Sequence, residues 1–355
     1  SSCYLIFYIS NVKEWCLNEI AAGYATAGGS WEDPVYLFAD YGIYSGFYAS
    51  SSLGFRCVRN SPNAKGNQGA MKLNLDERTP TYHPVDEETF KRFLSLYKYD
   101  RIPPDVEVVE TRETPDWTRL KITFRGVHDD RVIAYMYLPK RAKKPFQCIN
   151  FIPHSGVFYG VNIAETTEYI FAPHIKTGRA VLAVVPKGAV EREWGSNYLE
   201  PEINTVRYRE ETVKYATEFS LGLDYLATRD DIDMGKLAYV GVSWGAHCAL
   251  MSAAVEIRYR TVVFIGGGLE KSDEQKLPGA NPINFLPYIK PPKLLLNGKY
   301  DETFPFETHA RPFYNLMREP KKLALVEGGH TPPLEQRVPV LNQWLDETLG
   351  PVKFE

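Results

Sequence analysis

The fold is decided by residues 236–249, which read Lys-Leu-Ala-Tyr-Val-Gly-Val-Ser-Trp-Gly-Ala-His-Cys-Ala. The apolar run 237–240 predicts a strand, and the small residues after Gly245 predict a helix. Between them stands the pattern G-x-S-x-G, centred on Ser243. A serine placed between a strand and a helix lies in a tight, strained turn that exposes its hydroxyl above the sheet. Gly241 and Gly245 lack Cβ atoms, so neighbouring backbone can approach this turn closely.

This strand–turn–helix arrangement resembles the nucleophile elbow of α/β-hydrolases. The pattern alone is weak evidence, because glycine and serine are common and an ordinary Gly-Ser turn is the simpler alternative. The strand before it, and an acid and a histidine later in the chain, favour the functional interpretation. We therefore predict that Ser243 is a nucleophile and that the helix N-terminus beneath it offers free N–H groups to an oxyanion.

A serine needs a base that is oriented by a third group, and in α/β-hydrolases the order is serine, acid, histidine. Asp301 lies on the loop that follows the apolar strand 293–296, and His330 lies on a glycine-rich loop after strand 323–326. We expect His330 Nε2 to take the proton of Ser243 and return it to the leaving group. Asp301 is expected to fix the histidine tautomer through Nδ1 and to stabilise the imidazolium.

Alternatives exist for both partners. Glu302 is the second choice for the acid, because it is one residue away and is expected to face elsewhere. A lone histidine usually has a structural role, and we expect this of His83, His128, His174, His247 and His309. Of these, His247 is expected to pack beneath the elbow.

The oxyanion hole requires two backbone donors. One is expected to be the N–H of Trp244, directly after the nucleophile. The other is expected from the loop 153–157, which resembles the H-G-x loop of esterases with Ser155 inserted. Gly156 and Val157 are both candidates, and the sequence does not choose between them.

The substrate pocket is expected close to these donors. Its candidate residues are His154, Phe158, Tyr159 and Trp194, with Trp244 beside them. His154 is also expected to brace its own loop. The segment 186–207 is longer than a simple strand-to-helix turn needs, so it either walls the pocket or is a surface excursion.

The arrangement of apolar runs predicts an α/β fold. Three runs separated by turn residues predict an antiparallel meander, at 106–110, 120–124 and 132–138. Six further strands then alternate with helices, at 148–152, 180–185, 237–240, 262–265, 293–296 and 323–326. The helices are expected near 164–177, 208–228, 245–257, 306–318 and 334–348, with a short one beginning at Asp86. Such alternation implies a mostly parallel sheet with helices on both faces, which is the α/β-hydrolase arrangement.

Residues 1–60 differ from the rest and read as a small, irregular, loop-rich segment. The spaced elements N-V-x-E-W at 11–15, G-G-S-W at 28–31 and G-F-R at 54–56 resemble the C-terminal part of the formylglycine-generating-enzyme (sulfatase-modifying factor) domain. The Pro-, Asn- and Gly-rich residues 61–85 predict a linker. The predicted domains are therefore a remnant of that family at 1–60, the linker at 61–85 and the hydrolase domain at 86–355.

The likeness to the sulfatase-modifying factor does not extend to its chemistry. Oxidising members place cysteines just after the G-G-S element, whereas the run 32–38 contains none. The family's calcium loop would map to the backbones of Ser10 and Val12 and to the carboxylate of Glu14. The run 7–9 lacks the oxygen side chain expected there, so a structural remnant without metal is favoured over a calcium site.

Composition narrows the classes of function. The 355 residues are 44% hydrophobic and 13% aromatic, which supports a sizeable core, and the net charge of -3 argues against nucleic acid as a partner. No apolar run reaches the roughly 18 residues of a membrane span. Five cysteines without a C-x-x-C pair favour a reducing compartment, which suggests the cytoplasm. Because residue 1 is serine, we expect a fragment, a processed product or a trimmed chain.

From about residue 84 to 352 the chain resembles an α/β-hydrolase of the dienelactone hydrolase or acetyl esterase-like type. The runs 229–245 and 281–285, followed by Asp301 and His330, carry the likeness. Dienelactone hydrolases proper use cysteine at the elbow, and Ser243 departs from that. Together with the N-terminal segment, the chain resembles the C-terminal half of certain bacterial multidomain proteins of the serine/threonine kinase-like type, although it has no kinase motif.

The sequence thus predicts a serine hydrolase, a carboxylesterase acting on small to medium acyl esters without metal or cofactor. The expected partner is a small-molecule ester, with no nucleic acid and no membrane; a homodimer is compatible with the sequence. Two alternatives stay open. One is a peptidase of the prolyl-oligopeptidase type, although residues 1–60 are too few for a propeller. The other is a non-catalytic binding or scaffolding module.

Overall fold

The structure, a computed structural model, describes most of the chain. The described residues are 12–20, 23–31, 41–44, 46, 48–57, 80–101, 103–128, 130–194 and 201–354. Several expectations concern residues outside these ranges, namely most of the linker 61–85, the runs 7–9 and 32–38, and the backbone of Ser10. Within the described ranges, no helix combines the length and the apolar character that a membrane crossing needs.

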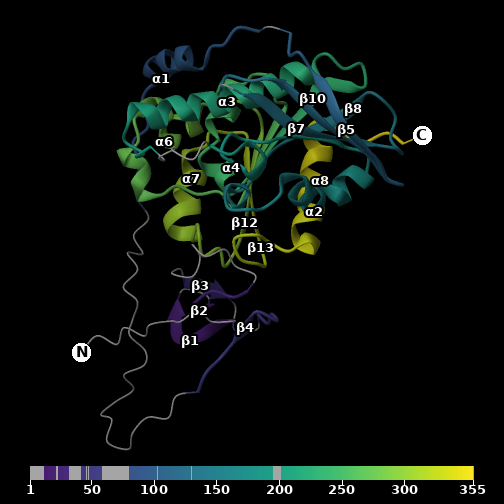
Figure 1. The fold of residues 1–355 in the computed structure, drawn as a ribbon. Coiled ribbons are helices and arrows are strands. Elements are labelled where there is room, and N and C mark those ends of the chain that lie inside the picture. The colour runs from purple at the N-terminus through teal and green to yellow at the C-terminus, as the bar shows by residue number, and fades with distance from the viewer. Residues whose placement is uncertain are drawn as a thin grey trace, which may run out of the picture.

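The larger part of the described chain is built on a nine-stranded sheet (Figure 1). The strands are β5 (Glu107–Glu113), β6 (Trp117–Arg125), β7 (Arg131–Pro139), β8 (Phe146–Ile152), β9 (Ala180–Val184), β10 (Ile232–Val242), β11 (Thr261–Ile265), β12 (Lys293–Gly298) and β13 (Lys321–Val326). Their order in space is β13-β12-β11-β10-β8-β9-β7-β6-β5. The strands β5, β6, β7 and β9 pair antiparallel in that order. The neighbours from β9 to β13 pair parallel.

The central strands are covered on both faces. β8, β9 and β12 are buried over their whole length, which explains why they read as continuous apolar runs rather than alternating ones. Their successive side chains enter two different core layers, as the strand period of two requires. In β8, Cys148 and Ile152 belong to one layer, whereas Ile149 and Phe151 belong to the other.

Helices form a layer on each side of the sheet. They are α1 (Glu87–Phe93), α2 (Ile163–Lys176), α3 (Val206–Leu226), α4 (Trp244–His247), α5 (Met251–Val255), α6 (Pro282–Phe285), α7 (Arg311–Leu316) and α8 (Leu334–Leu349). α2 and α8 lie side by side in Figure 1 and share one core layer, which includes Phe171 and Leu345. α1, α3 and α7 bury Phe90, Phe219 and Phe313 in the other layer. This is the α/β-hydrolase fold, and the predicted fold class is confirmed.

One predicted helix is wrong as a single element. The segment near 245–257 contains two short helices, α4 and α5, because a side chain breaks the hydrogen-bond ladder between them. The hydroxyl of Tyr239 donates to the carbonyl of Gly245 (2.6 Å), which an unbroken helix would offer to the N–H of Ala249. That N–H bonds to the carbonyl of Trp244 instead (3.1 Å).

The described part of the N-terminal segment forms its own four-stranded sheet, in the order β3-β2-β1-β4. Its strands are β1 (Lys13–Ile20), β2 (Gly23–Ala27), β3 (Tyr41–Tyr44) and β4 (Leu53–Gly54). The carboxylate of Glu14, which the family likeness relates to a calcium loop, accepts from Arg56 Nε at 2.6 Å. A side-chain cation therefore already neutralises this carboxylate.

The buried hydroxyl of Tyr239 gives a first prediction. Replacing it in Tyr239→Phe leaves the carbonyl of Gly245 without its donor, so the free energy of unfolding should fall by about 1–3 kcal/mol. Urea unfolding measures this change. Tyr169→Phe is the matched control, because this tyrosine is 63% exposed and should keep its stability. Equal stability of the two variants would contradict the account of the split helix.

Candidate active site

The elbow is strained and tightly packed. Ser243 follows β10 directly and has a positive φ of 52° with ψ of −108°, a conformation that residues with side chains rarely adopt. A Cβ on Gly245 would lie 2.2 Å from the carbonyl oxygen of Ile152, and a Cβ on Gly241 would lie 2.4 Å from the carbonyl oxygen of Gly245. Only glycine fits at these two positions, so the G-x-S-x-G spacing is a packing requirement of this turn.

Three side chains that are far apart in the sequence meet at this elbow. His330 Nε2 lies 2.7 Å from Ser243 Oγ, and its Nδ1 lies 2.9 and 3.1 Å from the two carboxylate oxygens of Asp301. The loops after β12 and β13 hold this arrangement because they touch each other. A Cβ on Gly298 would lie 2.1 Å from the carbonyl oxygen of Gly329, next to the histidine.

The carboxylate of Asp301 is buried and held from several directions. Its Oδ1 accepts from the backbone N–H groups of Thr303 (3.0 Å) and Phe304 (2.8 Å), and its Oδ2 lies 3.3 Å from the amide nitrogen of Asn297. These donors fix the carboxylate toward the imidazole. Burial alone would lower the pKa of His330, but the charge and hydrogen bond of Asp301 outweigh it and hold this pKa above its usual value.

Glu302 has a different position from its neighbour. Its Oε2 accepts from the backbone N–H of His330 at 3.1 Å, so it contacts the main chain of the histidine rather than the ring. Burial, followed by the nearby charge of Asp301, raises the pKa of the Glu302 carboxyl. The structure therefore places Asp301, and not Glu302, against the imidazole.

The candidate oxyanion donors divide into two groups. The N–H of Gly156 donates to the Nδ1 of His154 (3.0 Å), and the N–H of Val157 donates to the carbonyl of the same histidine (3.4 Å). Burial, and then the charge of nearby His330, lower the pKa of His154 to about 4, so its ring stays neutral and able to accept. Within the described ranges, no hydrogen bond engages the backbone N–H of Trp244 or of Ser155.

A cavity of about 370 Å³ opens beside the elbow. Four aromatic residues anticipated from the sequence line it, namely Phe158, Tyr159, Trp194 and Trp244. Ser155 lines it as well, whereas Ser243, which precedes Trp244, is not among the described lining residues. His154 is absent from the described lining, since its ring is engaged with Gly156.

The opposite wall of the cavity was not anticipated. One face of α3 supplies it, through Tyr208, Glu211, Thr212 and Tyr215. Their spacing of i, i+3, i+4 and i+7 puts them on one stripe of the helix. This mixed polar and aromatic stripe was the signal available in the sequence. Cys248, which follows α4, completes this side.

One described group of side chains has the donors of a metal site, namely His128, Asp130 and Glu218, whose donor atoms lie within 4.8 Å of one another. Arg192 already occupies the space between the two carboxylates. Its guanidinium lies 2.9 Å from Asp130 and 2.7 Å from Glu218, and both the arginine and Glu218 side chains are 1% exposed. These residues therefore fit a buried ion-pair cluster better than a cation site.

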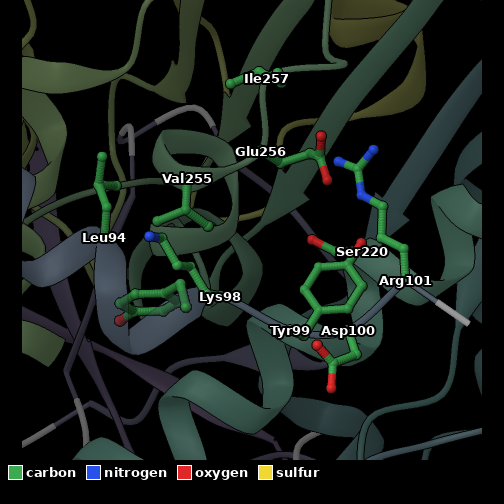
Figure 2. A pocket seen from close by; sticks show the side chains of 10 residues that line it. Leu94, Lys98, Tyr99, Asp100, Arg101, Ser220, Val255, Glu256 and Ile257 are labelled. Carbon is green, nitrogen blue, oxygen red and sulfur yellow. The ribbon is translucent and has the colours of Figure 1, made fainter.

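A second cavity, of about 570 Å³, lies between the turn Leu94–Tyr97 and α5. Figure 2 shows charged side chains around it, among them Lys98, Arg101 and Glu256. The Glu256 carboxylate is paired with Arg258 at 2.6 Å. The described lining of this cavity includes no histidine and no cysteine.

Neither a protein-family model nor a curated protein sequence matches the chain. Solved structures do. The acetyl xylan esterase 1 from Thermoanaerobacterium sp. JW/SL YS485 matches with a TM-score of 0.56 and 17% identity, over 78% of this chain and 99% of that one. The acetyl xylan esterase from Paenibacillus sp. R4 matches with a TM-score of 0.56 and 16% identity, over 77% and 98%.

A glucuronoyl esterase from Solibacter usitatus also matches, with a TM-score of 0.51 and 12% identity, over 77% of this chain and 98% of that one. At identities this low the likeness establishes the fold. The chain therefore has the α/β-hydrolase fold, over nearly the full length of these three neighbours.

The raised pKa of His330 gives a second prediction. Covalent labelling of Ser243 by a fluorophosphonate requires the neutral imidazole, so its rate should fall as the pH falls through that pKa. The midpoint should lie above the ordinary histidine value of about 6.5. Mass spectrometry of the labelled peptide measures the rate. In Asp301→Asn the midpoint should move down, and a flat profile in the unaltered protein would contradict the assignment of the base.

Proposed function

We propose that the protein is a serine carboxylesterase in which Ser243, His330 and Asp301 form the catalytic triad. The observation that carries this proposal is the continuous chain from hydroxyl to imidazole to carboxylate, with contacts of 2.7 and 2.9 Å, beside a cavity. The esterases among the structural neighbours support the reaction class, because they share the fold on which this chain presents its triad.

In the proposed acylation step, Ser243 Oγ attacks the ester carbonyl while His330 Nε2 accepts its proton. The imidazolium then protonates the leaving alcohol, and an acyl-enzyme remains. Asp301 keeps the Nδ1–H pointed toward itself, so that Nε2 is the atom that faces the nucleophile. Water activated by His330 then attacks the acyl group, releases the acid and restores the serine.

The negative charge of the tetrahedral intermediate requires donors that are not already engaged. The N–H groups of Trp244 and Ser155 meet this condition, whereas those of Gly156 and Val157 bond to His154. We assign the oxyanion hole to Trp244 and Ser155 on this ground. The assignment differs from the sequence-based expectation for the second donor by one residue.

The cavity supports esters of small to medium size. Its volume of about 370 Å³ is at the lower end of the range of small-molecule sites. Trp244 packs edge-on against Phe158 (ring centroids 5.0 Å apart) and Tyr215 (5.4 Å), so this part of the wall is rigid and aromatic. Such a wall suits a compact acyl or alcohol group better than a peptide chain.

A third prediction tests the reaction. The protein should hydrolyse p-nitrophenyl acetate, and Ser243→Ala should reduce the turnover number by at least about a thousandfold, because the covalent route is lost. An unchanged melting temperature is the control for folding. Turnover of peptide anilides without turnover of esters would assign a peptidase instead. A protein whose Ser243 is not labelled by a fluorophosphonate would be a binding module.

A fourth prediction tests the oxyanion donor. Ser155→Pro removes one backbone N–H at the first residue of a helical turn, a position that tolerates proline. The turnover number should fall by about 10²–10³ with little change in the Michaelis constant, because the lost bond forms in the transition state. Ser155→Ala keeps the N–H and should retain activity. Equal activity of the two variants would return the assignment to Gly156 or Val157.

A further inference from the structure

A second nucleophilic side chain lies at the cavity beside the elbow. Cys248 lines this cavity and is partly exposed to it. Its Sγ lies 3.5 Å from the Nδ1 of His247. The other ring nitrogen, Nε2, lies 2.9 and 3.0 Å from the carboxylate oxygens of Asp273. Thiol, imidazole and carboxylate thus form a chain of the kind that activates cysteine nucleophiles.

The carboxylate decides which ring nitrogen can act as a base. Asp273 accepts from the Nε2–H of His247, and it also accepts from Lys276 Nζ at 2.7 Å and from the backbone N–H of Glu270 at 2.8 Å. With Nε2 protonated, Nδ1 carries the free lone pair in the neutral ring, and this atom faces Cys248. The thiol proton therefore has an acceptor in place.

The surrounding charges favour transfer of that proton. Lys276 and Asp273 are both buried, and their opposite charges cancel. The thiol of Cys248 and the imidazole of His247 then share one proton. Two other titratable side chains interact electrostatically with the pair, Tyr208 on α3 with Cys248 and His309 with His247. Lys276 Nζ lies over the ring of Tyr208, 5.6 Å from the ring centroid. Glu211, also on α3, forms ion pairs with His128 and Lys214.

The electrostatics agree with this geometry. Burial raises the pKa of the Cys248 thiol, but the charges of His247 and Lys276 outweigh it and hold this pKa below the ordinary value. Burial likewise opposes the charge on His247, whereas the negative charges of Cys248 and Asp273 raise its pKa. The pair is stabilised as thiolate and imidazolium.

The hydrogen-bonded series Cys248–His247–Asp273 is separate from the series that contains Ser243. The ring of Phe304 contacts both imidazoles, with its centroid 5.4 Å from that of His247 and 5.6 Å from that of His330. Each histidine has its own carboxylate, Asp273 for His247 and Asp301 for His330.

We propose that Cys248 is a reaction site for small alkylating agents and low-molecular-weight disulfides, and that its modification closes the substrate cavity. The site itself does not depend on the proposed esterase activity, whereas the closure rests on it. A group attached to Sγ would occupy part of the cavity that Tyr208 and Trp244 also line. The substrate would then be excluded from the same space.

The exchange with a disulfide balances without a further reactant. The thiolate of Cys248 attacks one sulfur of the disulfide, a new S–S bond forms to the protein, and the original S–S bond breaks. The departing thiolate takes the electron pair and receives the proton from His247. Cys248 is oxidised to the disulfide level, and the departing half of the reagent is reduced to a thiol.

A fifth prediction, read by mass spectrometry on the unaltered chain, concerns the thiol. Iodoacetamide alkylation of Cys248 and of the exposed Cys57 is followed in one sample between about pH 5.5 and 9. The inflection of the Cys248 rate should lie at least about one pH unit below that of Cys57, as for thiols paired with a histidine. Because each cysteine is compared with itself across pH, a difference in access does not affect the result.

The closure of the substrate cavity is tested on the same protein, with bis(2-hydroxyethyl) disulfide as the reagent that modifies Cys248. Turnover of p-nitrophenyl acetate should fall at least about tenfold as Cys248 is modified and should recover with dithiothreitol. Cys57→Ser should lose activity in the same way. Cys248→Ser, compared with its own untreated sample, should lose none.

Two results would overturn the proposal, namely coincident inflections for Cys248 and Cys57, or full esterase activity in a chain whose Cys248 is fully modified. A chain with no esterase activity before treatment contradicts the proposed function instead, and the alkylation profile still decides the thiol site. The two failures are thus distinguishable.

Discussion

The site depends on one close contact between two pieces of backbone. The N–H of Gly245 donates to the carbonyl of Pro153 at 3.0 Å, and a Cβ at Gly245 would collide with the carbonyl of Ile152. This contact ties the elbow after β10 to the loop after β8. As a result Ser243 and the N–H groups of Trp244 and Ser155 share one edge of the sheet, and the loops of Asp301 and His330 need only reach this edge.

Much of the fold follows from local sequence, because parallel strands covered on both faces are continuous apolar runs with loops at a shared edge. This logic predicted the strands, their mostly parallel pairing and the loops of Asp301 and His330. It did not predict the break between α4 and α5, because that break depends on the hydroxyl of Tyr239, which reaches the helix only in three dimensions. The four-stranded N-terminal sheet was also missed, since its longest strand, β1, lacks a clear alternation of apolar and polar residues.

The hydrogen-bond donors and the cavity wall of the site were harder to predict than the residues Ser243, Asp301 and His330. Gly156 and Val157 were plausible donors by position, but the neutral ring of His154 accepts from the first of them, which a linear pattern cannot show. The α3 wall was missed because Tyr208 and Tyr215 lie far from the elbow in sequence. Side chains that act through their neighbours, such as Glu302 on the backbone of His330, have no motif of their own.

The ring of Phe304 has a consequence for chemical selectivity. It contacts the imidazoles of both His247 and His330 but offers no lone pair and no acidic proton. It therefore cannot pass a proton from one histidine to the other. His330 contacts the oxygen of Ser243, a hard nucleophile that favours acyl carbon. His247 contacts the sulfur of Cys248, a soft and polarisable nucleophile. The proposed esterase site and the proposed thiol site would therefore favour electrophiles of different hardness.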